Sequence, residues 1–382
     1  MTAWKRVILA GTALAAAVVV LLVLQSAGAR SRGPIGAFLD RLGAAVTSLE
    51  HGVRERLSGP GRRRDLAWFA QYREDGARLR RPDRVLLGAY DGRLPGSLDG
   101  FLALETLLGR TLPLVHVYAA WGDRPDQRFP ARVATTIWNM GSVPVITWEP
   151  WLTDFDSRLH PHLPLREDRD VHGLAAVASG AYDFYVDAWA RAAADAGYPI
   201  MLRFAHEMND PYRYPWGPQH NTKEEYIAAW RRVHARFRLA GADNVIWIWS
   251  PHVAHEYWDL YYPGDAYVDW VATGVLNFGP IAQWSRWWTF DEILGDQYAQ
   301  LAAFGQPVMI AEFGSLAVGG DRAAWYEAAL TDLPSRYPAI RSVLFFHASD
   351  DSTVTYQAVD WTLTGATEPA ATIRRALDGW GS

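Results

Sequence analysis

The sequence contains no cysteine, and this absence excludes disulfide bonds, thiolate metal ligands and a cysteine nucleophile. It also lacks an excess of positive charge. Its formal net charge is −5, so we expect no general attraction for nucleic acid. Charged residues are scarce as well, at 21% of the 382 residues against 49% hydrophobic, which argues against global disorder and allows a sizeable core. This length suits one large domain or two small ones.

Aromatic side chains are what the sequence has in abundance, with 19 Trp and 17 Tyr. Such rings can fill a core, but flat apolar faces also stack against the rings of bound sugars. Their number is therefore compatible with a carbohydrate-binding protein.

The N-terminal segment 1–29 has the features of an export signal. Lys5 and Arg6 precede an uncharged run over 7–24, which is about long enough to cross a bilayer. The small residues at 27–29 could form a signal-peptidase site, so an uncleaved anchor and a cleaved signal peptide both remain open. In either case we expect an extracytoplasmic protein, either membrane-anchored or secreted.

Residues 30–64 are predicted to form an amphipathic helix followed by a linker. Apolar residues recur at three- and four-residue steps along the segment. The run Gly59-Pro60-Gly61 then predicts a break. This places the start of the main domain at residue 65.

From residue 65 to 382, short apolar runs alternate with longer amphipathic ones. Two of the longer runs, 181–196 and 222–240, have one apolar face, and the second opens on a Thr222-x-x-Glu225 capping box. We expect strands at 85–90, 114–118, 143–148, 200–205, 245–250, 270–276, 308–312 and 342–346.

Eight buried strands alternating with helices favour a parallel sheet covered on both faces. Eight is also the number that closes into a (β/α)₈ TIM barrel, and 65–382 is long enough for one such domain. A doubly wound open sheet is the alternative. No G-x-G-x-x-G or phosphate-binding glycine loop follows the first strand to support it.

Polar residues follow most of the predicted strands. Glu207 comes directly after the fourth strand and Glu312 ends the seventh. In a parallel barrel these positions face one another across the mouth. Glycoside hydrolysis needs two carboxyl groups placed in this way, although either glutamate could instead be a salt-bridge partner of Arg203.

Three stretches carry a resemblance to a known family. The run Arg203-x-x-His206-Glu207-Met208-Asn209, followed by Tyr214-Pro215-Trp216-Gly217, resembles the acid/base segment of glycoside hydrolase family 26. Ile310-Ala311-Glu312-Phe313-Gly314 is similar to its nucleophile strand, and Thr147-Trp148-Glu149-Pro150 to the strand-3 segment of some members.

The resemblance implies a retaining (β/α)₈ glycosidase without cofactor. Glu207 would be the general acid/base and Glu312 the nucleophile. The substrate would be a β-linked polysaccharide: β-1,4-mannan by default, with mixed-linkage β-glucan and xylan as alternatives. We expect a monomer whose substrate-binding residues follow the strands: His206, Arg203, Asn209, Trp148, Glu149, Trp151, Trp216, His252, Asn277 and His347.

One departure from the family pattern concerns the sixth strand. Family members present a tyrosine there that hydrogen-bonds the nucleophile, and Leu276 occupies the aligned position. Tyr257, Tyr261 or Tyr262 could replace it from a neighbouring loop, or the nucleophile could be held differently. The departure leaves open a glycan-binding accessory protein in polysaccharide assembly that cleaves poorly.

The loops also contain histidines that could ligate a metal, including His160, His162, His172, His252 and His255. Without a thiolate or an H-E-x-x-H helix, scattered loop histidines are more often surface residues or sugar contacts. We therefore predict no metal site.

Overall fold

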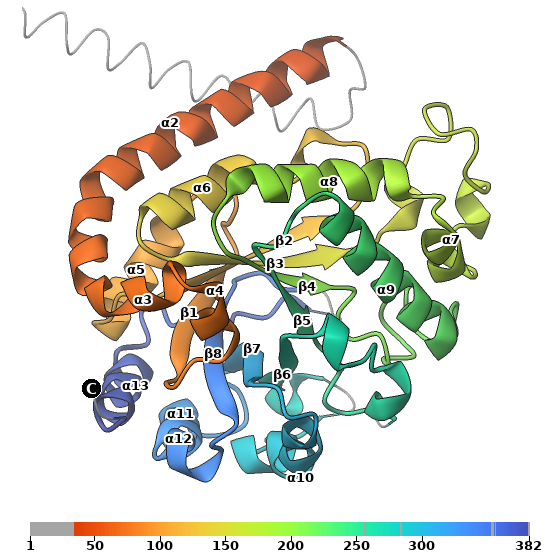
Figure 1. Ribbon diagram of the computed structural model, residues 1–382. Helices are drawn as coiled ribbons and strands as arrows, with labels where there is room; N and C mark the ends of the chain where they lie inside the picture. The colour runs from red at the N-terminus through yellow and green to blue at the C-terminus, as the bar shows by residue number, and fades with distance from the viewer. Residues whose placement is uncertain (1–33, 256, 283–284, 353–354, 356, 381–382) are drawn as a thin grey trace, which may run out of the picture. The chain divides into compact units, whose positions relative to one another are not determined.

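Strands β1 to β8 pair in parallel, each with its neighbour in sequence, and β8 pairs with β1 to close a barrel. The structure is a computed structural model that describes residues 34–382 except 256, 283–284, 353–354, 356 and 381–382. Helices surround the barrel on its outside (Figure 1). The predicted (β/α)₈ barrel is confirmed.

All eight predicted strands are present. They are β1 (Leu86–Asp91), β2 (Leu114–Ala120), β3 (Val143–Glu149), β4 (Ile200–Phe204), β5 (Val245–Trp249), β6 (Trp270–Asn277), β7 (Val308–Ser315) and β8 (Ile340–His347). The helices are α2 (Pro34–Asp65), α3 (Ala70–Arg73), α4 (Gly76–Arg80), α5 (Asp99–Leu108), α6 (Ala131–Asn139), α7 (Gly173–Ser179), α8 (Asp183–Ala196), α9 (Lys223–Leu239), α10 (Phe290–Ala303), α11 (Arg322–Leu330), α12 (Leu333–Arg336) and α13 (Thr367–Asp378).

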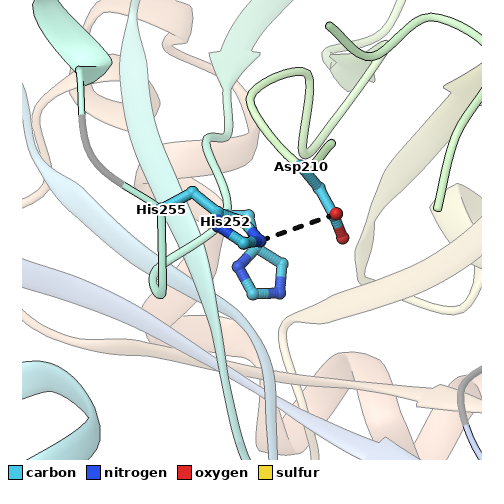
Figure 2. Close-up of side chains that lie close together, drawn as sticks. All are labelled: Asp210, His252 and His255. Carbon is cyan, nitrogen blue, oxygen red and sulfur yellow. Dashed lines mark ion pairs between the residues drawn. The ribbon is translucent and has the colours of Figure 1, made fainter. Parts of the chain in front are cut away.

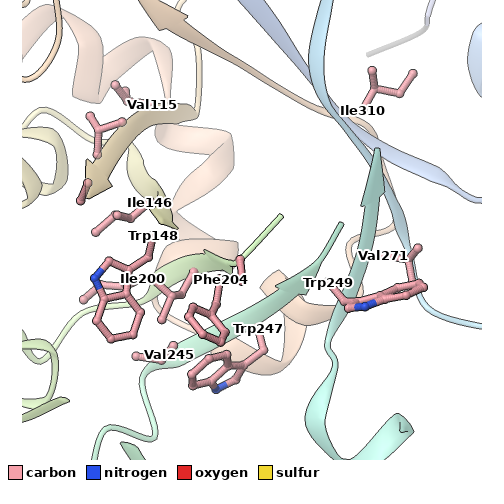
Figure 3. Packing of buried hydrophobic residues seen from close by; sticks show 14 of the residues in the cluster. Val115, Ile146, Trp148, Ile200, Phe204, Val245, Trp247, Trp249, Val271 and Ile310 are labelled. Carbon is pink, nitrogen blue, oxygen red and sulfur yellow. The ribbon is translucent and has the colours of Figure 1, made fainter. Parts of the chain in front are cut away.

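Two layers of apolar side chains result from the period-two alternation along each strand. Inward-facing residues such as Val145, Met201 and Ile248 fill the barrel. Outward-facing residues pack against the helices, and Figure 3 shows part of this layer, including Trp148, Phe204 and Trp247.

The β7 strand departs from this alternation, and the departure positions Glu312. Ile310 faces outward and Ala311 inward, so regular pleating would turn Glu312 towards the helices. Thr273 of β6 pairs with Ile310, however, and the next β6 residue, Gly274, pairs with Glu312. The extra residue on β7 is a β-bulge, which re-aims the following side chain. Glu312 therefore faces the barrel mouth.

The predicted linker at 59–64 is wrong. Helix α2 continues through Pro60 as far as Asp65, even though an interior proline removes one helix hydrogen bond. Its last turns are held by Arg62, which is buried and binds the Glu105 carboxylate at 2.7 and 2.9 Å. These tertiary contacts outweigh the local breaking tendency.

Two compact units divide the chain, one ending at Arg54 and one beginning at Glu55, and the barrel lies within the second. The domain boundary predicted at residue 65 thus falls inside the barrel unit. Among the helices in the described ranges, none combines the length and apolar character needed to span a membrane. The predicted segment 7–24 lies outside those ranges.

Candidate active site

Glu207 sits in a tight turn just after β4. Both Ala205 and Glu207 have positive φ angles, 43° and 54°, a region that costs non-glycine residues conformational energy. Two backbone hydrogen bonds hold the turn: Glu207 N–H donates to the Ser250 carbonyl at 2.7 Å, and Asp210 N–H donates to the Glu207 carbonyl at 3.0 Å. Backbone strain of this kind clusters at functional sites.

Glu312 is held by two donors on the same oxygen. Arg203 Nη2 donates to Oε1 at 2.6 Å and the Tyr118 hydroxyl donates at 2.7 Å. Burial by itself would raise the pKa of Glu312, but the Arg203 charge and these hydrogen bonds outweigh it and bring the pKa below its ordinary value. The carboxylate is therefore kept ionised, as a nucleophile requires.

The carboxyl groups of Glu207 and Glu312 both lie close to Gly274 of β6. A methyl group added to this glycine would lie 3.8 Å from Glu207 Oε1 and 3.9 Å from Glu312 Oε2. Both oxygens thus lie within 4 Å of the position of this methyl group. The distance between the two oxygens is therefore less than twice 4 Å. A retaining glycosidase places its carboxyl groups about 5–5.5 Å apart, and this arrangement accommodates that spacing.

Sequence comparisons agree with this geometry. The sequence profile of glycosyl hydrolase family 26 matches residues 132–318, which include both glutamates. Endoglucanase H from Acetivibrio thermocellus is 30% identical over 300 residues, covering 76% of this chain and 30% of that protein. The chain belongs to glycoside hydrolase family 26. The resemblance found in the motifs is confirmed.

Two further proteins extend the comparison. Mannan endo-1,4-beta-mannosidase A and B from Caldalkalibacillus mannanilyticus is 30% identical over 164 residues, 40% of this chain and 28% of that protein. A family 26 β-mannanase structure from Bacteroides ovatus superposes with a TM-score of 0.55 over 79% of this chain and 91% of that one, at 18% identity, and shows the shared fold. This chain spans less than a third of either sequence relative.

Arg203 supports the carboxylate of Glu312, with an Nη2–Oε1 distance of 2.6 Å. Its side chain is 1% exposed. It donates to Thr147 Oγ1 at 2.7 Å and to the Tyr118 hydroxyl at 3.1 Å, besides its bond to Glu312. A contact between Arg203 and the substrate stays a prediction. The alternative that Glu207 pairs with Arg203 is wrong, because the cation near Glu207 Oε2 is Arg213, at 3.4 Å.

His206 and Trp216 brace the loop that follows Glu207. The Trp216 indole donates to the His206 carbonyl at 2.7 Å and stacks on Tyr214 at 4.5 Å. Trp216 is 2% exposed, and its stacking on a sugar stays a prediction. His206 Nε2 hydrogen-bonds the Tyr214 hydroxyl at 3.0 Å. Burial and the nearby Arg203 charge lower the pKa of His206, which keeps the ring neutral.

Four other predicted sugar contacts are structural in this fold. Trp148 is fully buried in the outer layer against Trp189, 4.5 Å between ring centroids. Asn277 is buried and bonds Ser315. Asn209 donates to two carbonyls of the loop after β5. His347 is 3% exposed and pairs with Asp91 at 2.8 Å.

Three predicted contact residues keep partly exposed side chains after their strands: Glu149, Trp151 and His252. The Trp151 indole donates to Glu149 Oε2 at 3.1 Å. Burial raises the pKa of Glu149, with the Trp151 bond and the Arg203 charge opposing. These three remain candidates for substrate contact.

Tyr118 is the residue that the sequence reasoning missed. It lies on β2, whereas the expected substitutes for the strand-6 tyrosine were Tyr257, Tyr261 and Tyr262. Of these, Tyr257 is 66% exposed and Tyr262 packs on Trp249. Strand alternation could have identified Tyr118. Leu114 of the same strand faces into the barrel, and a residue four positions later lies on the same face of a strand.

Replacing Tyr118 with Phe should shift the acid limb of the kcat/KM profile to higher pH by about one unit. The variant loses a hydrogen bond to the charged form of Glu312, so the pKa of Glu312 rises towards its ordinary value. A carboxyl group with a lowered pKa stabilises the fold above its unfolded pKa and loses that contribution as pH falls through the folded value. The variant should therefore also lose some stability at neutral pH.

The measurement is a pair of pH–rate profiles, with Tyr90→Phe as the matched control. Tyr90 packs edge-on against Tyr118 at 4.8 Å, and in the described structure it has no hydrogen bond with Glu312. The control should leave the acid limb in place. An unmoved limb in Tyr118→Phe would contradict the assigned role.

Proposed function

We propose that this protein is a retaining endo-β-glycosidase that hydrolyses an extracytoplasmic β-linked polysaccharide. One observation carries the proposal: an oxygen of Glu207 and an oxygen of Glu312 lie within 4 Å of one point beside Gly274, and Glu312 is held ionised by Arg203 and Tyr118. This is the charge and geometry that double displacement requires.

In the first step, Glu312 attacks the anomeric carbon while Glu207 protonates the leaving glycosidic oxygen. The bond to the leaving sugar breaks and a glycosyl-enzyme ester forms. In the second step, Glu207, now a carboxylate, takes a proton from water as the water displaces Glu312. The donors on Glu312 Oε1 leave Oε2, the oxygen nearer to Gly274, for the attack.

The proposed substrate is β-1,4-mannan, with a β-glucan as the second candidate. The mannan assignment comes from the family resemblance and accords with the mannosidase relative. The β-glucan is favoured by the extent of the endoglucanase match, which covers 76% of this chain against 40% for the mannosidase. Both polymers belong in the same assay.

The test compares the full chain with Glu312→Gln on mannan, mixed-linkage glucan, xylan and other β-glucans, measuring released reducing ends. Release from one polymer, lost in the variant, is the expected result and names the substrate. Proton NMR of the first-formed product should show the β anomer. Binding without release from any polymer would instead support the accessory glycan-binding role.

Gly274→Ala should lower kcat/KM by at least about 100-fold with little change in stability. The new methyl group would make ordinary contacts of 3.8–3.9 Å in the free protein, but it would lie within 4 Å of an oxygen of each carboxyl group, where the proposed mechanism requires the sugar to bind. Thermal unfolding and kinetics on the same preparation check both parts. Gly314→Ala, whose methyl would contact Trp361 and Leu276 at 3.4–3.5 Å, is the control.

The apolar run over 7–24 and the basic residues before it are the basis for proposing export. In spheroplasts or protoplasts from cells producing the full chain, externally added protease should digest the barrel unit, unless that unit has been released into the medium. Protection from the protease, with digestion restored by lysis, would place the protein inside and overturn the extracytoplasmic part of the proposal.

A further inference from the structure

Beside the acid/base turn lies a cluster of three potential metal ligands from two different loops. Asp210 follows β4, while His252 and His255 follow β5, and one ligand atom of each lies within 4.8 Å of the others. Figure 2 shows the three side chains converging, with His255 Nε2 3.5 Å from Asp210 Oδ1. The two imidazole rings lie 4.8 Å apart, tilted by 37°.

The backbone around this cluster is already fixed by Asn209. Its Nδ2 donates to the carbonyls of His252 and His255 at 3.2 and 3.0 Å, and its Oδ1 accepts the His252 N–H at 2.7 Å. Asp210 is buried, and its Oδ1 accepts the Tyr212 N–H at 2.8 Å. The ligands therefore come from loops that are held in place before any ion binds, which lowers the ordering cost of binding.

We propose that Asp210, His252 and His255 form a binding site for a divalent transition-metal ion such as Zn²⁺. Two imidazoles and one carboxylate are ligands that suit zinc and its neighbours, whereas Ca²⁺ and Mg²⁺ prefer oxygen ligands. Bonds of about 2.0–2.2 Å place tetrahedral ligands about 3.5 Å apart, so the observed cluster needs a small inward rotation of its side chains. His252 Nδ1 accepts the Ala254 N–H at 3.1 Å, a bond that a metal on that nitrogen would replace.

The consequence of binding is a link between the loops that carry the acid/base group. Asp210 N–H bonds the Glu207 carbonyl, and Glu207 N–H bonds Ser250, two residues before His252. An ion on the cluster would cross-link these segments a second time. It would stabilise the mouth of the barrel.

The test uses the full chain without a histidine tag, stripped of metal with a chelator. Zinc titration by calorimetry should show one site in the barrel unit, and Co²⁺ should give visible absorption bands from imidazole coordination. At zinc about 100 times Kd, the thermal midpoint should rise by about 5 °C, whereas Ca²⁺ and Mg²⁺ should have no comparable effect.

Asp210→Asn and His255→Asn should each weaken zinc binding at least tenfold and abolish the thermal shift. His160→Asn is the matched control, because His160 pairs with Asp123 at 2.7 Å and the described residues form no three-ligand group there. This variant should bind zinc like the parent chain. Unchanged zinc affinity in both cluster variants, or no Co²⁺ spectrum from the folded chain, would overturn the proposal. These readouts do not depend on polysaccharide cleavage, so this site and the proposed activity can fail separately.

Discussion

Replacing Glu312 with Ala is expected to reduce polysaccharide cleavage by about 10⁴-fold or more, because the nucleophile of the proposed double displacement is gone. Azide added to this variant should restore part of the rate on an aryl glycoside. The small anion enters the space that the carboxylate occupied and attacks the anomeric carbon from that face. The product should therefore be the α-glycosyl azide, identified by proton NMR.

Glu207→Ala should respond differently, because Glu207 acts on the opposite side of the bond. On an aryl glycoside whose leaving group needs no protonation, the first step should stay fast and the second should become rate-limiting, giving a burst of phenol. Azide attacking the glycosyl-enzyme should yield the β-glycosyl azide. If the two variants gave the same anomer, the assigned roles would be wrong.

Glu149→Ala is the matched control for both glutamates, since it removes a third carboxyl group after a neighbouring strand. Glu149 bonds Trp151 and has no hydrogen bond to either glutamate within the described structure. Its loss should weaken substrate binding without changing the stereochemistry, and no glycosyl azide should form from it.

The strand pattern and the placement of the two glutamates at the ends of β4 and β7 could be predicted because both depend on local signals. Apolar runs bounded by polar residues marked each strand, and the Thr222 capping box marked the start of α9, where the structure has it. The inward orientation of Glu312 could not be predicted. It depends on the bulge in β7, and a bulge is visible only when the neighbouring strands are paired.

The sugar contacts were predicted less well, for reasons that lie in side-chain direction. Val145 faces into the barrel, so Thr147 also faces inward and Trp148 outward. Reading this alternation would have placed Trp148 in the core. No comparable rule applies to Trp216 or Asn209, because loop side chains are oriented by contacts with distant segments, such as Asn209 with the β5 loop.

Arg62→Ala should lower the free energy of unfolding by about 3–5 kcal/mol, the largest stability effect that we expect. Arg62 and Glu105 have side chains only 6% and 9% exposed, and they form a two-pronged ion pair. Arg62 also donates to the carbonyls of Met140 and Leu112 and to Ser142 Oγ. Its removal leaves the Glu105 carboxylate buried without its cation, with the Leu112 N–H at 2.6 Å as a remaining donor, and takes one donor each from the Met140 and Leu112 carbonyls.

Urea unfolding of the full chain measures the effect, with Arg64→Ala as the control. Arg64 lies two residues further along α2 and is exposed, so its replacement should change stability by less than about 0.5 kcal/mol. A double variant, Arg62→Met with Glu105→Leu, should recover much of the loss, because no buried charge is then unpaired. If Arg62→Ala were as stable as the parent, the end of α2 would not be part of the barrel unit's core, and a chain beginning at residue 65 would fold equally well. We expect instead that such a truncated chain, which lacks Arg62, is as destabilised as Arg62→Ala.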